Sequence, residues 1–316
     1  MTLWPKRHRA FFISPNELQY AHETRTVQPC REATGLPNDG HDCHECTHQI
    51  IAALLPQVQA PRPPVDILTD AEEIAGESDH FSHAVIGHTV SGRPIDCFSC
   101  GDGNRSALFY GFPDPGEAVA ASVILLLMRS LGSENLLRTF DLRWHFIPCI
   151  NFDDQPDSGR GLGPVFRDPR RKEVDWCIDA PRPETEALLR VAQDHCPVFI
   201  FPGHDEIHSR EDIPAYFGVA GRLSPDCAER IRRHFASLGI IIDANYSHET
   251  LGAGFFNMAK IEDSSKSTFS RFAKTGTVFV AEVAAWPGKA ETTPVSAQLA
   301  AVLLALDDVL SRDVPT

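Results

Sequence analysis

Two short apolar segments of this chain stop at a glycine, and acidic or histidine residues follow each of them. Residues 107–110 are followed by Asp114 and Glu117, and residues 198–201 are followed by His204. In an open α/β sheet, the loops after the carboxyl ends of neighbouring strands gather at one edge and form the binding crevice. The pattern therefore favours a fold in which short buried strands present polar loops at one edge of a sheet.

Strand and helix patterns alternate along most of the chain. Short apolar runs bounded by turn residues predict strands, and apolar residues recurring every three or four positions predict helices. We expect strands at residues 84–87, 90–98, 107–110, 142–150, 198–201 and 277–283, and helices at residues 44–57, 118–130, 183–196, 226–238 and 295–310. This alternation predicts an α/β fold with a mixed central β-sheet flanked by helices.

The bulk composition excludes several classes of partner. A formal net charge of −14 argues against nucleic acid and against an anionic membrane surface, both of which attract basic proteins. No apolar run approaches the roughly 18 residues that a membrane-spanning helix needs. The nine cysteines are an odd number scattered through apolar segments, which is typical of a reducing compartment, so we expect a cytoplasmic protein.

Asp114, Glu117, His204 and Glu282 are the candidate site residues that the pattern itself indicates. Two carboxylates and one imidazole at strand ends form a donor set for a metal site that keeps a position open for water. Glu282 lies in the apolar segment 277–283, where a buried charge is costly unless it is paired or functional. Two other interpretations stay open, because acids are also favoured in the first turn of a helix, and Glu282 could face solvent from an edge strand.

Several segments together carry a resemblance to a known family. They are residues 86–95 (IGHTVSGRPI), 111–117 (GFPDPGE), 146–153 (FIPCINFD), 173–176 (EVDW), 183–189 (PETEALL), 264–265 (SS) and 280–283 (VAEV). In their order and spacing, over roughly residues 84–290, the chain resembles the zinc carboxypeptidase family, the carboxypeptidase A type metallopeptidases, and in particular its bacterial branch. The resemblance implies a carboxypeptidase-like catalytic domain over residues 65–316, preceded by an N-terminal extension over residues 1–64 that holds a helix and a Cys/His cluster.

The resemblance also implies roles for individual residues. Asp114, Glu117 and His204 match the three positions that hold zinc, and Glu282 matches the general base that activates water for hydrolysis of a peptide or amide bond. Further residues are expected to contact the substrate or stabilise its oxyanion: Arg160 and Arg167 through their guanidinium groups, and Asn151, Tyr246 and His208 as substrate-binding residues.

Asp114 departs from the family, which has histidine at this position. Two carboxylates and one imidazole neutralise a dication, whereas two imidazoles and one carboxylate leave it with one positive charge. The oxygen-rich set extends the expected metal from zinc to Mn²⁺ or Fe²⁺. We expect a small peptide or an N-acyl amino acid as substrate. The alternative is a carboxypeptidase-fold protein that has lost catalysis and serves as a binding module.

The N-terminal extension contains a second group of potential metal ligands. His44-Glu-Cys-Thr-His48 fits the pattern in which two histidines one helical turn apart bind zinc. A second interpretation is an accessory or structural metal site formed by Cys30, Cys43, Cys46 and His48, because Cys43 and Cys46 have the spacing of zinc ligands.

Overall fold

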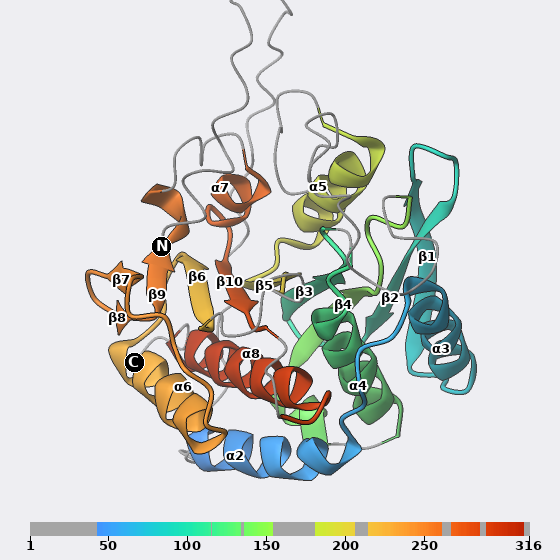
Figure 1. Ribbon diagram of the computed structural model, residues 1–316. Helices are drawn as coiled ribbons and strands as arrows, with labels where there is room; N and C mark the ends of the chain where they lie inside the picture. The colour runs from blue at the N-terminus through green and yellow to red at the C-terminus, as the bar shows by residue number, and fades with distance from the viewer. Residues whose placement is uncertain are drawn as a thin grey trace, which may run out of the picture.

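The computed structural model describes residues 43–312, apart from residues 115, 134–135, 154–180, 206–213, 261–266 and 285–288. In these residues a central sheet is covered by helices on both faces, as Figure 1 shows. Its strands are β1 (Phe81–His88), β2 (Pro94–Cys100), β3 (Arg105–Gly111), β4 (Leu142–Ile147), β5 (Phe199–Gly203), β6 (Tyr216–Ala220), β9 (Phe255–Asn257) and β10 (Thr277–Glu282), and a separate hairpin joins β7 (Ser247–His248) to β8 (Gly252–Ala253). The helices are α2 (Cys43–Leu54), α3 (Pro64–Gly76), α4 (Val119–Ser133), α5 (Pro183–His195), α6 (Pro225–Ser237), α7 (Thr268–Phe272) and α8 (Thr293–Arg312), with short 3₁₀ turns η1 (Leu55–Gln57), η2 (Leu136–Phe140) and η4 (Met258–Lys260).

The sheet is mixed, which confirms the predicted fold class. Its strand order is β1-β2-β4-β3-β5-β10-β6-β9. The central strands β4, β3, β5 and β10 run parallel to one another. Strand β2 pairs antiparallel with both β1 and β4, and β6 pairs antiparallel with β10. The parallel centre places the carboxyl ends of β3 and β5 side by side, which is where a ligand site is expected.

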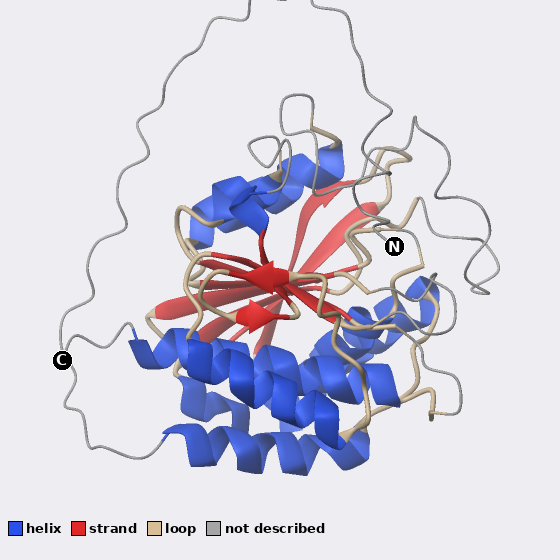
Figure 2. Cartoon of the chain, turned by 60° about the vertical axis from the view of Figure 1, so that its left-hand side comes forward, coloured by secondary structure: helices blue, strands red, loops and turns tan. Residues whose placement is uncertain are grey.

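Helices cover the sheet unequally (Figure 2). Helices α2, α3, α4, α6 and α8 share one large hydrophobic cluster with one face of the sheet. Helices α5 and α7 contribute to a smaller cluster on the opposite face. Strands buried on both faces read as continuous apolar runs, which is why β3 and β10 were recognisable in the sequence.

Helix α8 is the core helix of the larger layer. By length and composition alone it could cross a membrane, and it is the one helix of the described residues that could. However, 89% of its apolar window is buried within the protein, against α2, α4, α6 and the sheet. Burial of this kind is what a core helix of a folded domain shows.

Most of the predicted elements are present, with ends shifted by a few residues. The elements that were missed are helices α3 and α7, strands β6 and β9, and the hairpin of β7 and β8. Helix α3 begins at Pro64, at the end of a proline-rich segment that would disrupt a helix interior, because proline is well tolerated at the first position of a helix. The predicted domain boundary at residue 64 stays a prediction. Helix α2 precedes that boundary and packs on α8 through Ile50, Ile51 and Leu54.

Two glycines let helix α4 approach the sheet edge where β3 and β5 end. Gly111 and Gly203 are register partners at the last position of the two strands. A Cβ atom on Gly203 would lie 2.5 Å from Ala120 Cβ and 2.6 Å from the Tyr110 carbonyl oxygen. These distances are too short for a side chain of any kind, so glycine is required for this close packing.

We expect the Gly203→Ala variant to be less stable by about 1–3 kcal/mol, because the added methyl group overpacks the contact between α4 and β5. Urea unfolding followed by circular dichroism measures the change. Gly76→Ala is the matched control, because a Cβ atom at Gly76 meets no atom within 4 Å at the end of α3. Equal stability of the two variants would show that the close approach is not a constraint.

Candidate metal centre

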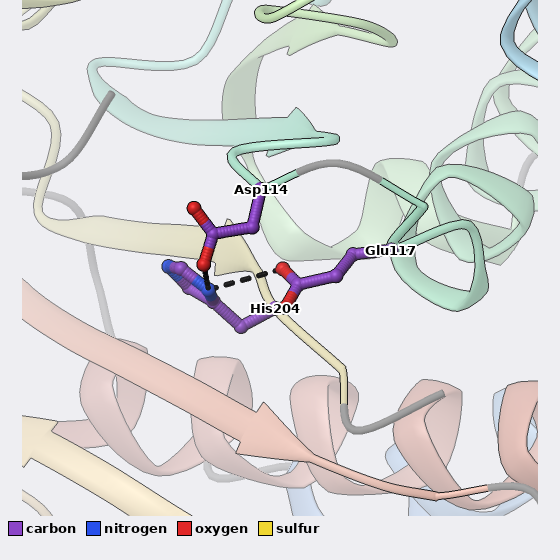
Figure 3. Close-up of side chains that lie close together, drawn as sticks. All are labelled: Asp114, Glu117 and His204. Carbon is purple, nitrogen blue, oxygen red and sulfur yellow. Dashed lines mark ion pairs between the residues drawn. The ribbon is translucent and has the colours of Figure 1, made fainter. Parts of the chain in front are cut away.

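Asp114, Glu117 and His204 converge at the carboxyl edge of the sheet (Figure 3). Asp114 and Glu117 lie between β3 and α4, and His204 directly follows β5. Because β3 and β5 are adjacent parallel strands, the two segments meet although they are far apart in the sequence. All three side chains are buried, with exposed fractions of 9%, 6% and 7%. The structure therefore brings together three of the four candidate residues that the sequence pattern indicates.

The distances between the side chains suit a single cation. His204 Nδ1 lies 3.1 Å from Glu117 Oε2 and 3.8 Å from Asp114 Oδ2. One ligand atom of each residue lies within 4.8 Å of the other two. An ion bonded to oxygen and nitrogen at about 2.0–2.2 Å needs donors separated by roughly 3–4 Å. The donor set thus fits a divalent metal ion.

The electrostatics of the cluster favour a positive charge. Burial raises the pKa of Glu117 well above the usual carboxyl range, and the charge of Asp114 raises it further. His204 acts in the opposite direction, while the charge of Glu282 adds to the increase. Ionised carboxylates in a dry pocket are costly, and a bound cation would remove that cost. Glu282 therefore acts on the same electrostatic site as the three candidate ligands.

Glu282 is the last residue of β10 and is 7% exposed. The solvent-facing interpretation is therefore wrong. On β6 its register partner is Tyr216, and the ring of Tyr246 stacks on that tyrosine with centroids 4.6 Å apart. Tyr246 thus lies beside the strand pair that carries Glu282. Its role in substrate binding stays a prediction.

Asp205, the residue after His204, ties the two ligand segments together. Its Oδ2 accepts a hydrogen bond of 2.8 Å from the backbone nitrogen of Val119, and both groups are buried. Val119 opens helix α4, two residues after Glu117. A carboxylate that accepts a hydrogen bond at a helix N-terminus also interacts favourably with the helix dipole. Sequence reasoning overlooked Asp205, although its place beside His204 was a signal.

A chain of hydrogen bonds supports the backbone next to Asp114. The Asn151 amide nitrogen donates to the Pro113 carbonyl oxygen at 3.3 Å, and Arg182 donates to Asn151 Oδ1 at 3.2 Å. Arg182 also donates from two nitrogens to Glu184, which is fully buried. Asn151 was expected to bind substrate. In this structure both ends of its amide group contact protein, and the substrate role stays a prediction.

Other expected site residues lie outside the described part of the chain. These are Arg160, Arg167, His208 and Cys30, together with the side chains of Cys43, His44 and Glu45. Of the proposed accessory metal site, Cys46 and His48 are described. Cys46 Sγ lies 4.0 Å from Thr139 Oγ1, whereas His48 is close enough to His234 to help lower its pKa, which burial lowers most.

The spacing of Cys46 and His48 on helix α2 separates their side chains. Positions two residues apart on an α-helix point roughly 200° apart, so these two side chains leave the helix on nearly opposite sides. Among the described residues, Asp114, Glu117 and His204 are the one group able to hold a metal ion. The accessory site and the zinc pattern at residues 44–48 stay predictions.

Comparison with known proteins identifies the fold. No family model matches the sequence, and no curated protein matches it. A metallo-carboxypeptidase from Pseudomonas aeruginosa, solved in complex with (2-guanidinoethylmercapto)succinic acid, is similar over 78% of this chain and 68% of its own, with 16% identity and a TM-score of 0.50. Bovine thrombin-activatable fibrinolysis inhibitor, solved in complex with tick carboxypeptidase inhibitor, is similar over 80% of this chain and 97% of its own, with 12% identity and a TM-score of 0.51. The chain has the metallo-carboxypeptidase fold, which confirms the resemblance found in the sequence.

We expect Arg182→Met to lower the free energy of unfolding by about 3–5 kcal/mol, because it leaves the carboxylate of Glu184 buried without its charge partner. Chemical denaturation measures the loss. The Arg182→Met/Glu184→Gln double variant should recover most of it, since the buried charge is then removed. Arg190→Met on the exposed face of α5 is the control and should change stability by less than about 0.5 kcal/mol. A double variant no more stable than Arg182→Met would contradict this account.

Proposed function

We propose that this protein is a metal-dependent hydrolase that cleaves a peptide or amide bond. The observation that carries the proposal is the buried convergence of Asp114, Glu117 and His204, with the charge of Glu282 acting on the same pocket. The metallo-carboxypeptidase fold supports it, because the cluster lies where the parallel strands of the fold end. Zinc is the proposed metal, and the two carboxylates also suit Mn²⁺ or Fe²⁺.

Asp114, Glu117 and His204 would hold the ion through two oxygens and one nitrogen. A bound zinc ion supplies Lewis acidity, which lowers the pKa of its water and polarises the carbonyl group of the substrate. Glu282 would accept the proton from the attacking water and deliver it to the leaving nitrogen. It is buried, and its charge contributes to the raised pKa of Glu117, which places it in the same electrostatic site as the candidate ligands.

The proposed substrate is a small peptide or an N-acyl amino acid. Both contain an amide bond next to a carboxylate, and a guanidinium group recognises a carboxylate through two parallel hydrogen bonds. Arg160 and Arg167 are the proposed partners of that carboxylate and of the oxyanion formed during hydrolysis. The complexes of the two similar proteins, one with a succinic acid derivative and one with a carboxypeptidase inhibitor, support a peptide-like ligand.

We expect the protein purified without added metal to carry about one metal ion per chain, and the Glu117→Ala/His204→Ala variant to carry none, because two of three ligands are lost. Elemental analysis by mass spectrometry measures the content. A matched control is Glu72→Ala/His80→Ala, which removes an exposed acid and an exposed histidine. Wild-type protein without stoichiometric metal would disprove the proposal that this protein is a metal-dependent hydrolase. Metal retained by the Glu117/His204 variant would point to the cysteines and histidines of residues 30–48.

We expect Glu282→Gln to lower the hydrolysis rate by about 10²–10⁴-fold while leaving the metal content unchanged, because it removes the proton acceptor and not a ligand. The assay is release of free amine from a panel of dipeptides and N-acyl amino acids. Glu249→Gln, a change at an exposed acid, is the control. A wild-type protein that holds metal and binds these compounds without cleaving any of them would instead support the alternative, a carboxypeptidase-fold protein that has lost catalysis and serves as a binding module.

A further inference from the structure

Strands β5 and β10 form a fork at the site. They are paired only at Thr277–Phe199 and Val278–Ile200. Beyond that point β5 continues along β3 as far as Gly203, and β10 continues along β6 as far as Glu282. His204 and Glu282 each lie four residues beyond the last shared pair, Ile200 and Val278. The candidate ligand and the candidate base therefore occupy the tips of two diverging strands.

Gln298 of helix α8 fills this fork. Its Nε2 donates to the carbonyl oxygen of His204 at 2.8 Å and to the carbonyl oxygen of Ala281 at 2.7 Å. Both partners are carbonyl oxygens, which only accept hydrogen bonds, so the amide nitrogen must face them. The two hydrogens of one amide group thus bridge both arms of the fork, at His204 on one arm and at Ala281, the residue before Glu282, on the other.

The surroundings of Gln298 indicate that this bridge is a specific feature. The side chain is fully buried, among the apolar residues of α8. Its Oε1 is buried and has no hydrogen-bond partner within the described part of the chain. A buried amide that leaves one polar atom unsatisfied is costly, and an apolar residue of the same size would avoid that cost. The two donated hydrogen bonds are the evident compensation.

We propose that Gln298 is a positioning residue that joins the ends of β5 and β10 and thereby sets the separation between His204 and Glu282. The role in positioning rests on the proposed function, whereas the joining of the two strands does not. Gln298 acts through the backbone of His204 and Ala281, whose carbonyl oxygens accept its two hydrogen bonds. An arrangement of this kind makes the ligand and the base move together, which preserves the geometry that catalysis needs.

The test compares wild-type protein with Gln298→Met and Gln298→Glu. Methionine keeps the size and removes the donors, and glutamate keeps the shape while placing acceptor oxygens against two carbonyl groups. Ser224→Ala is the control. It removes the hydroxyl group that caps α6 and donates to Asp308 of α8, which lies ten residues along the helix from Gln298. It should lower thermal stability without affecting the site.

Hydrogen exchange first tests the bridge itself, with no need for a metal. We expect backbone amides at residues 203–205 and 281–284 to exchange at least 10-fold faster in Gln298→Met than in wild-type protein or Ser224→Ala. Unchanged exchange would overturn the bridge. If the wild-type protein holds no stoichiometric metal ion, the proposed function fails, and the exchange result still decides whether Gln298 joins the strands.

Zinc affinity then tests the positioning role. Competition with a chromophoric chelator should show about 10-fold weaker binding in Gln298→Met, and at least as large a loss in Gln298→Glu, because support of a ligand typically contributes 10–100-fold. In the same variants kcat for the amide panel should fall with little change in KM. Faster exchange together with unchanged zinc affinity and unchanged kcat would show that the bridge does not set the site, and the proposal would be wrong.

Discussion

The burial of two carboxylates and one imidazole at one edge of the sheet is the constraint that the surrounding structure satisfies. The side chains of Asp114, Glu117 and His204 are buried, and both burial and the charge of Asp114 raise the pKa of Glu117. Such an arrangement persists only if the backbone that carries it is held firmly. Asp205 fixes the start of helix α4, and Gln298 fixes the backbone of His204. The support is built from buried hydrogen bonds, which weaken little with salt.

Asp114 is the feature that separates this chain from the family it resembles. An aspartate in place of histidine keeps a ligand atom at the site, since Asp114 Oδ2 lies 3.8 Å from His204 Nδ1. It also changes the charge of a metal complex from plus one to zero, so a bound ion would acidify its water less strongly. Glu282, the proposed base, is buried, and its charge adds to the rise in the pKa of Glu117.

The fold could be predicted wherever local pattern and tertiary environment agree. Strands β3, β5 and β10 are buried on both faces, so their sequences are continuously apolar and easily recognised. Strand β6 is also buried, but Gly218 interrupts its apolar run at the middle position, whereas the glycine of β5 stands at its end. Local propensity at β6 is overridden by packing against its neighbours, which a single sequence does not reveal.

The sequence by itself determined which residues could form the centre, because strand ends that carry acids and histidine follow from local pattern and from the order of the family-like segments. Only the tertiary structure decided which residues hold that centre in place. The bond from Gln298 to His204 joins positions 94 residues apart, and the bond from Asn151 to the backbone at Pro113 spans 38. A lone polar residue in an apolar helix has no partner nearby in the sequence from which its role could be predicted. Its hydrogen bonds exist only after the strands and helix α8 have packed, because folding alone brings the donor to its acceptors.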